Sequence, residues 1–190
     1  MSDVPAAPEE IATARLRLRK PRLDDAGGLF RAYASDDRVT PFMTWRTHQS
    51  EAETLAFLRS CLADWSSGTR YSYVIELGDG DAGPVGVIDL RGSGHLWEFG
   101  YVIARAFWGR GYMTEALSTL VDWSLAQPQV WRASAFCDVE NRASARVMEK
   151  AGMTFEGILR RYCIHPNLSS APRDCRMYAK VRSARGDAPG

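Results

Sequence analysis

Hydrophobic and polar residues along this chain follow two different periods, and the switches between them predict its secondary structure. Strict alternation, the period of a half-buried strand, occurs at 15–20, which reads RLRLRK. Runs rich in β-branched and aromatic residues, bounded by turns that contain glycine, predict six further strands. These strands cover 71–77, 85–90, 96–103, 132–137, 154–162 and 176–181.

Apolar residues spaced three or four positions apart predict four helices. The first covers about 24–35 and begins with an aspartate that can cap it, and the second begins at Ser50, whose spacing from Glu53 is that of a capping box. The third follows residue 111, and the fourth covers 143–151. The buried stripe of the third helix is predicted to be Met113, Ala116, Leu117, Leu120, Val121 and Ser124.

The predicted order of elements is strand, two helices, three strands, helix, strand, helix and two strands. Strands joined by short turns pair antiparallel, whereas strands joined through a helix can cross over and pair parallel. The order therefore predicts an α/β fold with one mixed, mostly antiparallel sheet of about seven strands and helices on both faces. We expect a single domain over 11–182, with loose ends at 1–10 and 183–190.

Composition and charge narrow the classes of protein. The chain has 190 residues, of which 45% are hydrophobic and 25% charged, which suits one domain with a sizeable core. Its formal net charge of +1 gives no reason to expect nucleic acid or a membrane surface as partner. The sequence contains neither an apolar run of membrane-spanning length nor a signal peptide, which predicts a cytoplasmic protein. The four cysteines and three histidines lack metal-ligand spacing, so no metal is expected.

The candidate chemistry is concentrated where a strand passes into the third helix, at 106–117 (AFWGRGYMTEAL). Gly109 and Gly111 flank Arg110 directly before the helix. A helix N-terminus offers unpaired N–H groups and partial positive charge, and glycine lets an anion approach the backbone closely. The spelling excludes GxxxxGK[ST] and GxGxxG. The segment is therefore either a phosphate-binding loop of another kind or a plain strand-to-helix turn.

Two segments together resemble a known family. They are 98–117 (EFGYVIARAFWGRGYMTEAL) and 138–162 (DVENRASARVMEKAGMTFEGILRRY). The first is similar to motif A of the GNAT acetyltransferase superfamily, Q/R-x-x-G-x-G/A, which reads W-G-R-G-Y-M here. The second resembles the Rim-type branch, the ribosomal-protein N-terminal acetyltransferases, through Asn141 and Ser144 followed by EKAGM at 149–153.

The resemblance implies a GNAT fold in which two central strands, here 98–103 and 132–137, splay apart to form a cleft for the co-substrate acetyl-CoA. The backbone at Val102 and Ile103 would bind the pantetheine arm together with Asn141, which is also a good cap for the fourth helix. The pyrophosphate would bind at the N-terminus of the third helix. The implied loop residues are Trp108, Gly109, Arg110, Gly111, Tyr112, Met113 and Thr114, and Ser144 is the implied residue near the leaving sulfur.

The resemblance also implies a reaction, the direct attack of a primary amine on the acetyl thioester. Making the neutral amine at pH 7.4 costs roughly 0.5–1 kcal/mol for an α-amino group and roughly 4 kcal/mol for lysine. A weak base therefore suffices for a peptide N-terminus. Glu98 is the candidate base and Ser144 the candidate acid or thiolate stabiliser. Their structural alternatives are an ion pair on a strand and a serine that bonds the backbone in the first turn of a helix.

The acceptor is less well defined by the sequence. Phe42 and Trp45, in 41–48 (PFMTWRTH), and Asp174, in 162–175, are candidate residues of the acceptor-site walls. A peptide or protein α-amine is slightly favoured, and a small-molecule amine such as an antibiotic, amino acid or polyamine is the alternative. Met148 stands where many superfamily members have a tyrosine, which keeps a non-catalytic acyl-CoA-binding module as a third interpretation. We expect a monomer or a homodimer.

Overall fold

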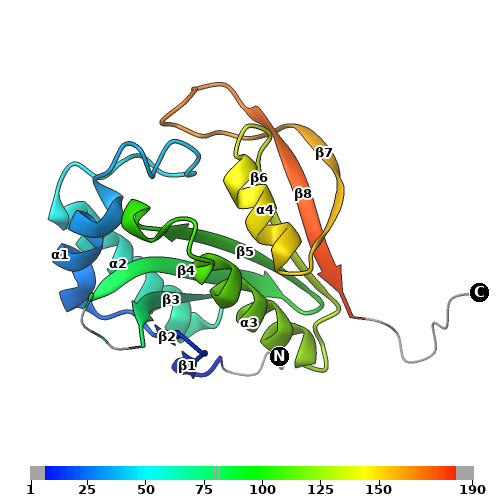
Figure 1. Cartoon of the computed structure of the whole chain (residues 1–190), viewed down its shortest axis with the longest axis horizontal. Helices are drawn as coiled ribbons and strands as arrows, with labels where there is room; N and C mark the ends of the chain where they lie inside the picture. Colours follow the sequence, from blue (N-terminus) through cyan, green and yellow to red (C-terminus); the bar gives the residue numbers. More distant parts are fainter. Residues whose placement is uncertain (1–6, 79, 81, 183–190) are drawn as a thin grey trace, which may run out of the picture.

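The structure is a computed structural model that describes residues 7–78, 80 and 82–182 (Figure 1). Its strands form one sheet in the order β1-β2-β3-β4-β5-β6-β8-β7. They are β1 (Glu10–Ala12), β2 (Leu16–Arg19), β3 (Arg70–Leu77), β4 (Pro84–Ser93), β5 (Leu96–Ile103), β6 (Arg132–Asp138), β7 (Thr154–Cys163) and β8 (Arg173–Val181). The α-helices of the described residues are α1 (Ala26–Leu29), α2 (Glu51–Ser67), α3 (Tyr112–Ala126) and α4 (Arg142–Lys150).

The sheet is mixed and mostly antiparallel, as predicted. Strands β1 to β5 form an antiparallel meander, β5 pairs parallel with β6, and β8 lies antiparallel between β6 and β7. The described residues give eight strands rather than about seven, because β1 adds to the edge of β2.

The prediction of a loose N-terminal end was wrong for residues 7–10. Ala7 is buried, the Tyr73 hydroxyl donates to the Pro8 carbonyl at 2.8 Å, and Glu10 belongs to β1. These residues were assigned to a loose end because their composition is rich in alanine, proline and acid, yet pairing with β2 holds them on the sheet. Residues 1–6 and 183–190 lie outside the described residues.

Helices cover both faces of the sheet, as predicted: α1 and α2 lie on one face, and α3 and α4 on the other (Figure 1). Because side chains alternate between the faces of a strand, β3 sends Tyr73 and Ile75 into the core beneath α3 and Val74 into the core beneath α1 and α2. The predicted stripe of α3 is confirmed at every one of its positions. Each large apolar side chain buried in this way contributes about 1.5–3 kcal/mol.

Two helix starts differ from the sequence prediction. Helix α2 begins directly after Ser50, as its spacing indicates, but the Ser50 hydroxyl makes no capping hydrogen bond. The predicted helix over 24–35 is instead a 3-10 turn, the short α1 and a π turn. Asp25 is not the N-cap of α1; its buried carboxylate pairs with Arg19 at 2.6 Å and accepts from the Arg22 N–H at 2.7 Å. No helix among the described residues has the length and apolarity to cross a membrane.

The two central strands separate, as the resemblance implies. Strands β5 and β6 pair over only four residues each, Leu96–Phe99 with Arg132–Ala135, and we call this stretch the β5–β6 seam. Beyond it, β5 remains paired with β4 through Ile103, and β6 remains paired with β8 through Asp138. Each strand therefore stays ordered by one edge while its other edge opens into a cleft.

Candidate active site

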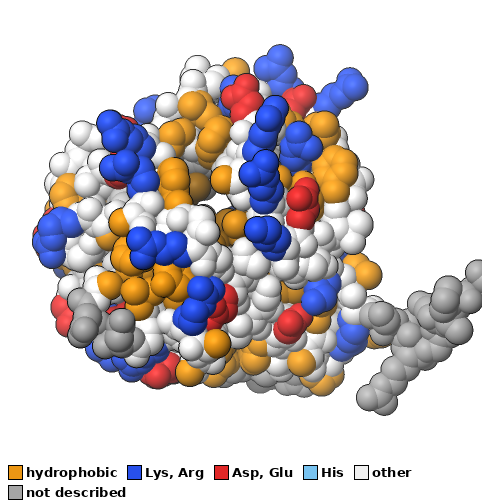
Figure 2. Space-filling view, viewed as in Figure 1, with side chains coloured by type: hydrophobic (Ala, Val, Ile, Leu, Met, Phe, Trp, Pro, Cys, Tyr) orange, Lys and Arg blue, Asp and Glu red, His pale blue; other side chains and the backbone are white. Residues whose placement is uncertain are grey.

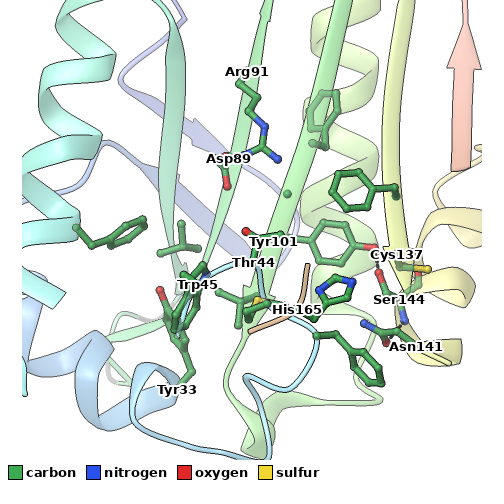
Figure 3. Close-up of a pocket in the computed structure, with 18 of the residues that line it drawn as sticks. Tyr33, Thr44, Trp45, Asp89, Arg91, Tyr101, Cys137, Asn141, Ser144 and His165 are labelled. Atoms are coloured by element: carbon green, nitrogen blue, oxygen red, sulfur yellow. Dashed lines mark hydrogen bonds and ion pairs between the residues drawn. The ribbon is translucent and has the colours of Figure 1, made fainter. Parts of the chain in front are cut away.

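The opening between β5 and β6 is part of a pocket that reaches both faces of the sheet. Figure 3 shows that its labelled side chains come from distant segments, with Tyr101 of β5 near the middle and Ser144 of α4 at one side. The lining residues are Tyr33, Phe42, Met43, Thr44, Trp45, His48, Phe57, Arg70, Val87, Asp89, Arg91, Phe99, Gly100, Tyr101, Val102, Phe136, Cys137, Asn141, Ser144 and His165.

At one end of the cleft, the glycine segment forms an open helix N-terminus. Gly109 and Gly111 have φ values of 72° and 77°, in the left-handed region that favours glycine. The first helical hydrogen bond runs from the Glu115 N–H to the Gly111 carbonyl at 3.0 Å. The N–H groups from Gly109 to Thr114 have no partner among the described residues, so they are free to bind an anion.

The residues around this N-terminus leave its backbone accessible. The Met113 side chain is buried in the core, so a long side chain at this position does not block the helix end. The exposed Trp108 donates its indole N–H to the Ile103 carbonyl at 2.8 Å and ties the turn to the end of β5. That carbonyl, an expected pantetheine contact, therefore already has a partner, whereas Val102 lines the pocket directly.

Arginines supply positive charge at the same place. Arg110 is exposed, and Arg15 donates to the Arg110 carbonyl at 3.0 Å while pairing with Glu115 at 2.7 Å. Figure 2 shows a hollow near the centre of this face with Lys and Arg side chains gathered around it. Arg15 was not identified from the sequence, because it lies directly before β2, far from the glycine loop along the chain.

Helix α4 brings two predicted residues to the cleft. Asn141 caps the helix as predicted, since its side-chain oxygen accepts from the Ser144 N–H at 3.1 Å. The Ser144 hydroxyl lies 2.8 Å from the Tyr101 hydroxyl, and both line the pocket (Figure 3). Burial raises the pKa of Tyr101 well above its usual value, so this phenol stays protonated. Tyr101, which sequence reasoning missed, thus provides a hydroxyl beside Ser144, although the helix position of the usual tyrosine is Met148.

The charged floor of the pocket lies on β3, β4 and β5. Asp89 pairs with Arg70 at 2.9 Å and with Arg91 at 3.6 Å. Glu98 shares its sheet face with Gly100 and Val102, as predicted, but its carboxylate pairs with Arg91 at 3.0 Å and is not part of the pocket lining. The structure therefore places the predicted base beside the pocket, held by an arginine.

The predicted acceptor walls come together across the pocket. Phe42 and Trp45 line it, and Trp45 contacts Tyr33 and His48 with ring centroids 6.3 and 5.0 Å apart. The β7–β8 loop forms the facing wall. The Asn167 side chain joins the two walls, donating to the carbonyls of Thr40 and Trp45 at 2.8 and 2.9 Å and accepting from the Thr47 N–H at 3.1 Å. We call this set of contacts the Asn167 bridge.

Asp174 is not among the pocket-lining residues. Its carboxylate accepts from the backbone N–H of Arg161 at 2.9 Å, and Arg161 has a positive φ of 50° at an irregularity of β7. The structure thus gives Asp174 a local structural contact where sequence reasoning had suggested a substrate contact. Among the described residues, no group of three or more His, Cys, Asp and Glu side chains could hold a metal ion.

His165 was missed although it lines the pocket. It lies in the β7–β8 loop, is 1% exposed, and has no hydrogen-bond partner for Nδ1 among the described residues. Its ring meets Phe42 edge to face, with centroids 6.4 Å apart, and its Nε2 lies 3.7 Å from the Asp138 carboxylate. No local sequence motif marks this histidine, since its neighbours come from separate elements.

Comparison with known proteins places this geometry in a family. The family model described as an acetyltransferase (GNAT) domain matches residues 15–154. An uncharacterised N-acetyltransferase of Bacillus licheniformis, p20, is 31% identical over 156 residues, which are 81% of this chain and 87% of that protein.

Solved structures agree with the fold. The chain is similar to Mycobacterium smegmatis RimJ in complex with CoA-disulfide, with 26% identity and a TM-score of 0.76 over 87% of this chain and 81% of RimJ. The microcin C7 self-immunity acetyltransferase MccE, in complex with acetyl-CoA and AMP, has 22% identity and a TM-score of 0.82, covering 95% of this chain and all of that one. Because the family model matches most of the chain and p20 exceeds 30% identity, the chain belongs to the GNAT acetyltransferase family and is an N-acetyltransferase.

Proposed function

We propose that this protein transfers the acetyl group of acetyl-CoA to a primary amine, with the α-amino group of a peptide or protein N-terminus favoured. The observation that carries the proposal is the opening between β5 and β6, which is part of an aromatic-walled pocket and lies on the strand that leads into the anion-binding helix N-terminus. Tyr101 and Ser144 both line this pocket.

The cofactor end fits acetyl-CoA. Unpaired N–H groups from Gly109 to Thr114, with Arg110 beside them, suit a diphosphate. The open edge of β5, where Val102 lies, and the side chain of Asn141 suit the amides of the pantetheine arm. The ligands of RimJ and MccE, CoA-disulfide and acetyl-CoA, support the same assignment here.

The reaction needs attack by the amine nitrogen on the thioester carbon, loss of the C–S bond and protonation of the thiolate. We assign the last step to the Ser144 hydroxyl, which Tyr101 supports at 2.8 Å. The cleft holds both substrates in line, which lowers the entropic part of the barrier. The role of Glu98 as base stays a prediction, and its ion pair with Arg91 favours a role in holding the pocket floor.

The charges of the pocket favour an acceptor with a single amine. Its lining contains one carboxylate, Asp89, which already pairs with Arg70, so it offers little free negative charge to a polycation such as a polyamine. An α-amino group also needs the least help to lose its proton. The aromatic contacts around Trp45 favour a second candidate, a small-molecule amine with a flat apolar part.

Release of the CoA thiol over a panel of N-terminal peptides, polyamines, aminoglycosides and amino acids tests the proposal, with acetylated products identified by mass. Blanks without acceptor are needed, because the described residues include four free cysteines. We expect turnover with peptides and none with polyamines. Turnover confined to a small amine would move the function to the second candidate. Silence over the whole panel, with acetyl-CoA shown to bind, would make the protein a binding module.

A further inference from the structure

His165 is a buried polar side chain whose hydrogen-bonding capacity is unused where the acceptor would bind. It is 1% exposed, and its Nδ1 has no partner among the described residues. Burying a ring nitrogen without a partner costs free energy that a functional contact can justify. Since His165 lines the pocket together with Tyr101, Asn141 and Ser144 (Figure 3), the missing partner belongs to whatever fills that pocket.

The other ring nitrogen faces a fixed carboxylate. Nε2 lies 3.7 Å from Asp138 Oδ2, and Asp138 is fully buried. Burial alone would raise the pKa of Asp138, but hydrogen bonds from Arg173, at 2.5 Å, and from the Glu140 N–H, at 2.9 Å, outweigh it and hold the pKa below its usual value. The Cys175 Sγ also lies near Nε2, at 3.9 Å, and the permanent negative charge of Asp138 favours the tautomer with its proton on Nε2. Nδ1, which is buried, then carries the lone pair.

We propose that His165 is the proton acceptor for the amine substrate, with Asp138 as the residue that fixes its tautomer and orientation. This rests on the proposed acetyl transfer. As the amine nitrogen forms its bond to the acetyl carbon and the C–S bond breaks, the nitrogen loses a proton to Nδ1 of His165. The thiolate receives its proton from the Ser144 hydroxyl, and both groups re-equilibrate with solvent.

The groups around the His165 ring are neutral thiols and a phenol beside one buried ion-pair network. The titratable and charged groups of the elements around its ring are Asp138 and Cys137 on β6, Arg173 and Cys175 on β8, and Tyr101 on β5. Burial raises the pKa of Cys137 to about 11 and that of Cys175 to about 12, and it raises that of the phenol too. The thiols and the phenol therefore stay neutral, and the charged groups are Asp138, Arg173 and Glu140, whose carboxylate also pairs with Arg173 at 2.8 Å. The facing loop contributes the uncharged Phe42.

His165 also has an advantage over Glu98 as proton acceptor. The Glu98 carboxylate is already engaged by Arg91 through two nitrogens, Nε at 3.2 Å and Nη2 at 3.0 Å. Glu98 is also outside the pocket lining, whereas His165 is part of it. The two assignments therefore differ in which variant, His165→Gln or Glu98→Gln, should lose the proton transfer from the amine.

The pH dependence of kcat/KM for His165→Gln distinguishes a proton acceptor from a structural residue. At pH 7 we expect a loss of about 10²-fold, the lower part of the range for general bases, because an α-amine is nearly neutral already. The loss should shrink as the pH rises above the pKa of the acceptor amine, since the free amine then needs no base. Binding of acetyl-CoA should be unchanged.

The other two histidines of the chain are matched controls. His48 lines the same pocket, but its Nδ1 is already paired with Thr54 at 2.8 Å, so His48→Gln should show a loss that does not vary with pH. His95 is exposed in the turn between β4 and β5, and His95→Gln should leave turnover unchanged. If His165→Gln does not fold, His165→Ala is assayed with added imidazole, which should restore turnover.

The pH dependence and the imidazole rescue each decide whether His165 is the proton acceptor. A loss in His165→Gln that is the same at every pH, or His165→Ala that imidazole does not restore, would overturn the role of His165 alone. A pH-dependent loss in Glu98→Gln instead would return the role to Glu98. A wild-type protein that transfers acetyl to no amine would overturn the proposed function, and this inference with it.

Discussion

The two ends of the cleft are built in different ways. The proposed cofactor end consists mainly of backbone from one contiguous segment, with N–H groups from Gly109 to Thr114 at the start of α3. The proposed acceptor end consists of side chains from separate segments, held together by the Asn167 bridge. A backbone site tolerates changes of side chain, so Trp108 and Met113 occupy motif positions without closing it. A side-chain site changes its chemistry with every substitution in its walls.

Where the two ends meet, the hydroxyl pair should produce the largest effect. Tyr101→Phe and Ser144→Ala are each expected to lower kcat by about 10²-fold. Because the two hydroxyls are 2.8 Å apart and act together, the double variant should be no worse than either single one. Steady-state kinetics with saturating acetyl-CoA measures this.

Tyr178→Phe is the control for removal of a tyrosine hydroxyl. Its hydroxyl donates to Glu149 at 2.9 Å, and the residue is outside the pocket lining, so turnover should not change. Full turnover in both Tyr101→Phe and Ser144→Ala would show that neither hydroxyl assists the leaving sulfur.

At the cofactor end, Gly111→Ala should raise the KM for acetyl-CoA about tenfold, equivalent to about 1.4 kcal/mol. Alanine is strained at a φ of 77° and adds a methyl group beside the helix N-terminus. Gly94→Ala imposes similar strain at a φ of 60° in the turn between β4 and β5, with open space around the new methyl group. Equal KM values for the two variants would mean that the helix N-terminus does not bind the diphosphate.

At the acceptor end, Asn167→Asp should raise the KM for the amine about fivefold, roughly 1 kcal/mol, and leave the KM for acetyl-CoA unchanged. The carboxylate cannot donate to the Thr40 and Trp45 carbonyls, so unfolding should also become easier by about 1–3 kcal/mol in a denaturant titration.

Ser170→Asp adds the same charge at an exposed position of the same loop without touching the Asn167 bridge, and it should leave the amine KM in place. A similar change in both variants would assign the effect to charge, and an unchanged KM in Asn167→Asp would separate the bridge from acceptor binding.

Most of the fold could be predicted from the sequence, because its signals are local. The stripe of α3, the strand at 96–103 and the cap at Asn141 each depend on residues close together along the chain. The helical segment predicted at about 24–35 is present, but it is divided into a 3-10 turn, α1 and a π turn, and the Asp25 carboxylate pairs with Arg19 instead of capping α1. A tertiary ion pair of this kind leaves no periodic pattern.

The residues of the candidate site likewise divide into those with a local sequence signal and those without one. The cofactor residues follow one motif, whereas Tyr101, His165 and Asn167 become neighbours only when the β5–β6 opening and two loops come together. Glu98 was chosen for its strand face, and no sequence pattern reveals that Arg91 opposite it occupies its carboxylate. Pairing partners of this kind are set by strand register.

The β5–β6 seam also has a mechanical consequence. Four residue pairs are the only strand pairing between β1–β5 and the β6–β8–β7 group within the described residues, and Figure 1 shows the two groups extending away from each other beyond them. A small rotation about so short a joint changes the width of the cleft while the hydrogen bonds inside each group stay intact. The core beneath α3 and α4 and the Asn167 bridge also join the two groups, so the width of the cleft depends on these contacts as well as on the seam. A ligand that spans both groups adds one more link between them.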